Sequence, residues 1–250
     1  MATAIAQGLV AQGCYAFSVA DTHAPALNRW RNEFAATTLQ GSPDAIVLAV
    51  KPQQFLEAAQ SLTGVLAPHT VVISIMAGIP IARIAAALGQ QCAIVRTMPN
   101  TPARIAQGIT GLFATAQCSA EQTALATRVM ASIGQTVWLD SETQLDAVTA
   151  VSGSGPAYVF YVAQAMTQAG IDLGLPAATA RQLALATMQG AAALALDCGE
   201  DLDALREQVT SKGGTTHAAM SVLQDRQVAQ AFHAALAAAD ARAKALAELA

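Results

Sequence analysis

Short, almost purely apolar runs recur in the first half of the chain, and a helical pattern follows each of them. The clearest three are residues 44–50, 71–75 and 93–97. A run of this length without polar alternation is typical of a strand buried on both faces, as in a parallel sheet. Strands that alternate with helices at this spacing predict an α/β fold with a doubly wound, largely parallel sheet.

The other elements of the first half complete this pattern. Gly13 and Pro52 mark a helix end and a helix start, as glycine and proline commonly do. We expect further strands at residues 15–20, 108–114 and 136–139, and helices at residues 1–12, 24–34, 53–62, 81–88 and 120–133.

From residue 142 onward the sequence shows helical patterns only. They cover residues 143–151, 156–173, 176–197, 201–208, 216–224 and 226–249. We therefore expect two domains, a sheet domain over residues 1–141 and an all-helical domain over residues 142–250. The helices are alanine-rich and apolar on more than one face, which indicates that part of their surface is buried in a partner chain. A homodimer or higher homo-oligomer is expected, and a self-contained monomeric bundle is the alternative.

Composition excludes several classes of function. The formal net charge is −4 and the only lysines are Lys51, Lys212 and Lys244, which argues against nucleic-acid binding. No apolar run reaches the roughly 18–20 residues that span a bilayer, and the first residues lack the basic region of a secretory signal.

Neither cysteine nor histidine spacing indicates a metal site. The four cysteines are scattered without a C-x-x-C pair, and the four histidines are isolated from one another. We expect reduced thiols, no metal centre and a cytoplasmic protein.

A glycine- and threonine-rich run precedes the helix at residues 216–224 and is a candidate binding corner. Its members are Ser211, Gly213, Gly214, Thr215 and Thr216. Such a run places free backbone N–H groups and hydroxyls at the positive end of a helix dipole, which suits a carboxylate or phosphate. An ordinary helix cap with a Gly-Gly turn is the structural alternative.

The wider string around this corner, residues 205–225, resembles the signature of pyrroline-5-carboxylate reductases, V-T-S-P-G-G-T-T, with Lys212 in place of the proline. Residues 146–158 match the family's D-A-V-T-A-V-S-G-S-G-P-A-Y, although Pro156 alone would also fit a plain helix–helix junction. Three loops after expected strands resemble the family's AVKP, AAG and MPNTP segments. The resemblance extends over essentially the whole chain.

The resemblance implies a Rossmann-like dinucleotide-binding domain followed by a helical dimerisation and substrate domain. The implied reaction is reduction of L-1-pyrroline-5-carboxylate to L-proline, with hydride from NADPH or NADH. Backbone N–H groups around Ser211, Gly213, Gly214 and Thr215 would hold the substrate carboxylate. Thr216, the implied catalytic residue, would hydrogen-bond the ring nitrogen. The implied cofactor contacts are Met1, Ala2, Thr22, Ala49, Val50, Lys51, Ala77, Gly78, Pro99 and Asn100.

The start of the chain departs from the family pattern. A dinucleotide site of this class needs a strand and then a G-x-G-x-x-G/A turn, but Met1 and Ala2 correspond to the last two residues of that motif. Gly8 and Gly13 lie within and after the following helix and cannot replace the leading glycines. We expect roughly a dozen residues to be missing upstream, with a degenerate protein as the alternative. The segment 35–44 is also a few residues shorter than is usual.

Two further questions stay open at the level of sequence. Asp21 favours NADH because a carboxylate accepts a hydrogen bond from the ribose 2′-OH, whereas Thr22 would donate to the 2′-phosphate of NADPH. The alternatives to the reductase are a related imine or β-hydroxyacid-type reductase and a non-catalytic dimerising remnant with a broken cofactor site.

Overall fold

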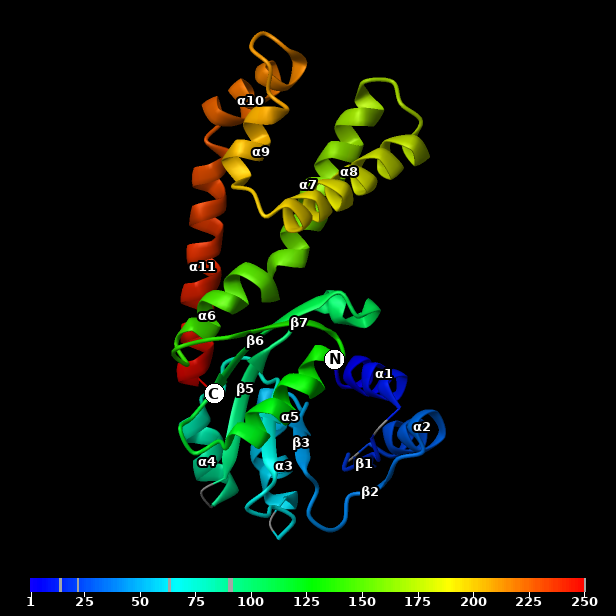
Figure 1. Ribbon diagram of the computed structural model, residues 1–250, viewed down its shortest axis with the longest axis vertical. Helices are drawn as coiled ribbons and strands as arrows, with labels where there is room; N and C mark the ends of the chain where they lie inside the picture. Colours follow the sequence, from blue (N-terminus) through cyan, green and yellow to red (C-terminus); the bar gives the residue numbers. More distant parts are fainter. Residues whose placement is uncertain (14, 22, 63, 90–91, 250) are drawn as a thin grey trace. The chain divides into compact units, whose positions relative to one another are not determined.

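The computed structural model describes the chain except for residues 14, 22, 63, 90–91 and 250, and the side chains of residues 248 and 249 (Figure 1). Its contacts form two compact units. The first unit comprises Met1–Ser154 together with Ala239–Ala250, and the second comprises Gly155–Ala238. The domain boundary after residue 141 stays a prediction.

The main sheet of the first unit has five strands in the order β3-β4-β5-β6-β7. The strands are β3 (Ala45–Leu48), β4 (Val71–Ser74), β5 (Ala93–Met98), β6 (Gly108–Ala114) and β7 (Gly134–Trp138). All neighbouring pairs are parallel except β5 and β6. Each strand coincides with a predicted strand to within a few residues at either end, and the predicted fold class is confirmed.

Two short strands form a separate parallel pair, β1 (Ser18–Val19) with β2 (Thr37–Thr38). The strand predicted at residues 15–20 is therefore present only in its centre, and β2 was not predicted because Thr37-Thr38 carries no apolar pattern. In the described part of the chain no strand joins this pair to β3. The strands predicted for one sheet thus lie in two sheets, with β1 in one and β3 to β7 in the other.

Helices cover both faces of the main sheet and build two apolar clusters. On one face, α1 (Ala2–Gln12) and α5 (Ala120–Ala131) pack against the strands, with Ile5, Leu9 and Val129 among the buried residues. On the other face, α3 (Phe55–Ser61) and α4 (Ile81–Leu88) bury Phe55 and Ile84. A two-sided core of this kind explains why the strands are apolar throughout.

Other helices of the first unit follow the predicted pattern with local differences. Helix α2 spans Ala24–Phe34, and the short 3-10 helices η1 (Pro52–Gln54) and η2 (Thr101–Ile105) follow β3 and β5. The single helix predicted at residues 143–151 consists of α6 (Gln144–Val148) and a π-helical turn, η3 (Thr149–Gly153). The turn is π-helical because backbone N–H groups donate to carbonyls five residues earlier. One example is the N–H of Ser154, which donates to the carbonyl of Thr149 (2.9 Å).

The second unit is all-helical, as predicted for this half of the chain. It contains α7 (Gly155–Asp172), α8 (Ala177–Cys198), α9 (Leu202–Gln208), α10 (Thr215–Asp225) and the start of α11 (Val228–Leu249). Large apolar side chains are exposed on these helices, including Tyr161 at 74% and Leu173 at 86%. Surfaces of this kind indicate a protein interface. None of the helices in the described residues is long and apolar enough to cross a membrane.

Candidate cofactor edge and substrate corner

Three predicted cofactor loops lie on one edge of the main sheet. The register places Leu48 beside Ser74 and Ser74 beside Arg96, so β3, β4 and β5 end close to one another along the sheet. The loops that follow these strands carry Ala49, Val50 and Lys51, then Ala77 and Gly78, and finally Pro99 and Asn100. Ligands of open parallel sheets bind beyond this carboxyl edge. We refer to these loops as the carboxyl edge.

The residues of the carboxyl edge divide into an exposed set and a buried set. Ala49, Lys51 and Ala77 are exposed, and two of the three have no side chain beyond Cβ. Pro99 and Asn100 are buried. The exposed set can form a flat contact surface, whereas the buried set holds the loops in place.

Two contacts show how the buried set acts. The side-chain Oδ1 of Asn100 accepts a hydrogen bond from the backbone N–H of Ile109 (3.0 Å), which ties its loop to β6. Gly78 has φ +76°, and a Cβ there would lie 3.4 Å from the backbone N of Ala247 near the end of α11. Glycine is favoured at this position because the backbone is left-handed and a helix lies close by.

A π-helical turn adjoins the same edge. A Cβ added at Gly153 would lie only 2.6 Å from Cε of Met98, so the turn packs directly on the end of β5. Within this turn the Oγ of Ser152 is buried and has no hydrogen-bond partner. Orphaned buried hydroxyls and π-helical turns are both frequent at functional sites. The sequence indicated a motif of the resembled family and a helix junction here, but not a π-helical turn.

A partly buried ion cluster of Arg96, Glu142 and Asp146 stabilises the carboxyl edge. The sequence analysis did not predict it. The Arg96 side chain, 7% exposed, donates from Nη1 to Oε1 of Glu142 (3.0 Å), and its Nη2 lies 3.9 Å from Oδ1 of Asp146. The same Glu142 oxygen accepts from the backbone N–H of Ile81, at the start of α4 (2.7 Å). One carboxylate therefore connects β5 to the helix that follows the Ala77–Gly78 loop. The sequence did contain a signal for this cluster, because an arginine within an apolar strand needs an acidic partner when it is buried.

The predicted contact Ala2, at the start of the chain, shares a cavity with two residues of the carboxyl edge. Ala2, Ala49 and Val50 line one cavity of about 1270 Å³ between α1, β1 and β3. Helix α1 begins after Met1 without a side-chain cap, so its first N–H groups have no side-chain partner. Thr22 lies outside the described residues.

The predicted substrate corner forms the start of α10 in the second unit. Gly214 is the N-cap of this helix, and no side chain caps it. Gly213 has φ +75°, and the N–H of Gly214 donates to the carbonyl of Ser211 (3.0 Å), which closes a tight turn. Within the described residues, the N–H groups of Gly213 and Thr215 have no hydrogen-bond partner.

The hydroxyl residues of this corner differ in exposure. Thr216 is half-buried, whereas Ser211 and Thr215 are exposed. Lys212, the departure from the family signature, is also exposed. The corner can therefore offer two backbone donors and one partly enclosed hydroxyl to a small anion. Across the described residues no group of histidine, cysteine or acidic side chains could hold a metal ion.

Comparisons with known proteins identify the family of the chain. A family model described as pyrroline-5-carboxylate reductase dimerisation matches residues 142–246, and a model described as NADP oxidoreductase, coenzyme F420-dependent, matches residues 1–78. The pyrroline-5-carboxylate reductase of Pseudomonas aeruginosa is 44% identical over 256 residues, which covers 99% of this chain and 94% of that protein.

Solved structures show the same likeness. A pyrroline-5-carboxylate reductase from Coxiella burnetii superposes with a TM-score of 0.91 at 37% identity and covers 98% of this chain and 94% of that one. The enzyme from Streptococcus pyogenes gives a TM-score of 0.86 at 27% identity, with 98% and 95% covered. The chain belongs to the pyrroline-5-carboxylate reductase family.

Proposed function

We propose that this chain reduces L-1-pyrroline-5-carboxylate to L-proline, the last step of proline biosynthesis, with NADPH or NADH as reductant. It is then an oxidoreductase that acts on a CH–NH group. The uncapped amino end of α10 carries the proposal, because it presents backbone donors beside a half-buried threonine hydroxyl. The relatives named above support the reaction class.

In the substrate corner, the free N–H groups of Gly213 and Thr215 hold the substrate carboxylate. The N–H of Gly214 already donates to Ser211, so its role is to shape the turn. The hydroxyl of Thr216 hydrogen-bonds the ring nitrogen and orients the C=N bond. A protonated imine is already a strong electrophile, so positioning and exclusion of water are the main demands on the protein.

The carboxyl edge fits a nicotinamide cofactor. Exposed Ala49 and Ala77 leave room for a flat ring, and Lys51 supplies a positive charge near the cofactor phosphates. The first N–H groups of α1, beside Met1 and Ala2, suit an anionic pyrophosphate. When bound, the cofactor supplies the hydride for the C=N carbon. Thr22 is retained as a proposed contact.

The partners and the location follow from the same assignment. A small-molecule substrate and a homodimer or higher homo-oligomer through the helical domain are proposed, and the dimerisation model that matches residues 142–246 supports self-association. We also propose that the protein is cytoplasmic.

The experiment compares Thr216→Val, which removes the hydroxyl at nearly constant shape, with Thr216→Ser, which keeps it. We expect the valine variant to lose roughly 10–100-fold in kcat/KM for pyrroline-5-carboxylate, since a hydrogen bond to a charged group contributes about 1.5–3 kcal/mol. Nicotinamide absorbance is the readout. Unchanged kcat/KM in the valine variant refutes the role of Thr216.

A thermal-shift titration of the unaltered chain with NADPH and NADH tests separately whether the chain binds either cofactor. A rise in melting temperature with either cofactor supports the reductase. No shift together with no turnover favours the non-catalytic dimerising remnant.

A further inference from the structure

The turn between α9 and α10 carries a lysine at a position that suits proline (Figure 1). The N–H of Gly214 donates to the carbonyl of Ser211 (3.0 Å), which closes a β-turn. Gly213 has φ +75°, whereas the φ of Lys212 is negative. These are the features of a type II turn, in which the second residue is commonly proline and the third is glycine. Lys212 occupies the second position.

The Lys212 side chain is exposed and adjoins the backbone donors of the substrate corner. Gly213 follows it directly and Thr215 lies three residues further on. In the described part of the chain, the N–H groups of Gly213 and Thr215 have no hydrogen-bond partner. A lysine side chain has a flexible stem of four carbons, so its ammonium group can approach an anion that is bound to these N–H groups.

The charge pattern makes Lys212 the cation closest along the chain to this corner. Between Glu207 and Asp225 it is the only lysine or arginine. Arg206, the preceding cation in the sequence, pairs with Asp203 (Nη1 to Oδ1, 2.8 Å). Lys212 forms no ion pair with any residue that the structure describes. Its charge is thus left for an incoming anion, in a chain whose formal net charge is −4.

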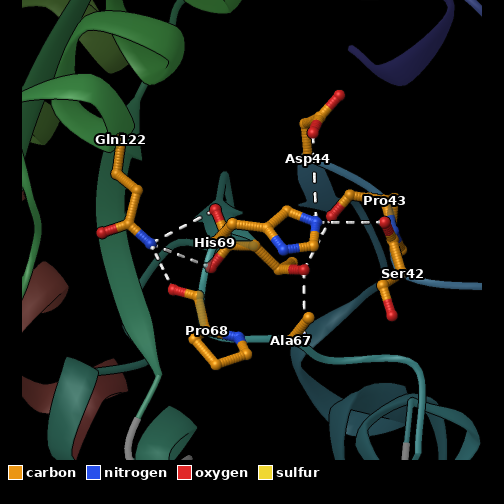
Figure 2. Close-up of polar contacts among 8 residues, drawn as sticks. Ser42, Pro43, Asp44, Ala67, Pro68, His69 and Gln122 are labelled. Carbon is orange, nitrogen blue, oxygen red and sulfur yellow. Dashed lines mark hydrogen bonds and ion pairs between the residues drawn. The ribbon is translucent and has the colours of Figure 1, made fainter.

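A polar loop cluster in the first unit shows the contrast (Figure 2). The side-chain amide of Gln122 donates to the carbonyls of Pro68 (3.1 Å) and His69 (3.3 Å). Thr70 Oγ1 donates to the carbonyl of Pro43 (2.7 Å). The polar groups of that cluster are paired within the protein, as is usual in folded chains. The donors and the cation of the substrate corner are not, which favours a ligand there.

We propose that Lys212 is a specificity-determining residue, a role that rests on the proposed function of the substrate corner. Its ammonium group pairs with the substrate carboxylate, so the chain favours cyclic imines that carry a carboxylate over neutral ones. The backbone N–H groups provide directed hydrogen bonds but no net charge, whereas Lys212 adds a full positive charge. The attraction is greatest at low ionic strength, since salt screens exposed charges.

The test measures kcat and KM for two substrates with the same ring, L-1-pyrroline-5-carboxylate and 1-pyrroline, with NADPH at low salt. Lys212→Gln removes the charge from the turn. We expect its KM for the carboxylated imine to rise about two- to fivefold with little change in kcat, the effect of one exposed charge pair. The KM for 1-pyrroline should stay the same. Lys212→Arg should retain the selectivity of the unaltered chain because it retains the charge.

Two further variants separate the charge from other effects. Lys212→Pro suits the second position of a type II turn and removes the charge, so it should lose at least as much selectivity as Lys212→Gln. Arg226→Gln removes an equal charge at the other end of α10, roughly 16 Å away along this helix of 11 residues, and should leave both KM values unchanged. At about 1 M salt the difference between the unaltered chain and Lys212→Gln should disappear.

The outcomes for Lys212 and for the proposed reaction can be told apart. If the unaltered chain reduces L-1-pyrroline-5-carboxylate and Lys212→Gln has the same selectivity, only the role of Lys212 is refuted. An equal rise in KM for both imines, or the same rise in Arg226→Gln, also refutes that role, because the loss then does not depend on charge at the corner. No reduction of the carboxylated imine by the unaltered chain refutes the proposed function and, with it, the role of Lys212.

Discussion

The Glu142 carboxylate is expected to be the strongest single polar support of the carboxyl edge. Its Oε1 accepts from Arg96 Nη1 (3.0 Å) and from the backbone N–H of Ile81 (2.7 Å). Glu142→Ala removes both bonds and leaves the Arg96 guanidinium, 7% exposed, with Asp146 at 3.9 Å as the nearest carboxylate. Glu142→Gln keeps an oxygen acceptor for both donors and removes only the charge.

The structure determines how much the free energy of unfolding should fall in the two Glu142 variants. Breaking a fully buried ion pair costs about 3–5 kcal/mol. The Glu142 side chain is 26% exposed and Asp146 remains as a partial partner, so we expect about 2–3 kcal/mol for Glu142→Ala. Glu142→Gln should cost only about 1 kcal/mol, close to the difference between a charged and a neutral hydrogen bond.

Urea unfolding followed by circular dichroism measures these free energies of unfolding, and an unchanged m-value shows that the comparison is valid. The alanine variant should also raise the KM for NADPH more than it lowers kcat, because Glu142 connects β5 to the helix after the Ala77–Gly78 loop. A loss below about 0.5 kcal/mol in Glu142→Ala would contradict the reasoning, since only surface substitutions are usually that mild. Equal losses in the two variants would show that charge, and not hydrogen-bond geometry, matters.

Three other outcomes are expected. Gly8→Ala places a Cβ 2.2 Å from the carbonyl oxygen of Ser132, so α1 must shift from the end of α5 and the free energy of unfolding should fall by about 1–3 kcal/mol in a urea titration. Burial raises the pKa of the Cys92 and Cys118 thiols, and the charge of Cys118 raises that of Cys92 further. The folded state therefore holds these protons more tightly, and the unfolding midpoint should fall as pH rises from about 8 to 10, less so in Cys92→Ala. Ser152→Ala removes an unpartnered buried hydroxyl, so the free energy of unfolding should stay within about 0.5 kcal/mol while NADPH-dependent turnover falls. A loss of stability without a loss of turnover would show that Ser152 has a structural role.

Local periodicity was sufficient to predict most elements of this chain. The runs around β3, β4 and β5 are apolar without interruption because both faces of each strand are buried, and that signal is visible in any window of several residues. The alanine-rich helical half was recognisable from its periodicity, and the glycine–threonine run before α10 from its residue types. The likeness to a family then indicated which loops to inspect, but not which side chains are exposed.

The sequence by itself determined the order and type of most of the elements, the two-sided apolar strands and the family of the chain. Only the tertiary structure decided that Arg96 pairs with Glu142, and that Asn100 ties its loop to β6 while Ala77 stays exposed. The physical reason is distance along the chain. Periodic patterns report on neighbours a few residues apart, whereas these contacts join segments whose approach depends on how the whole sheet is assembled.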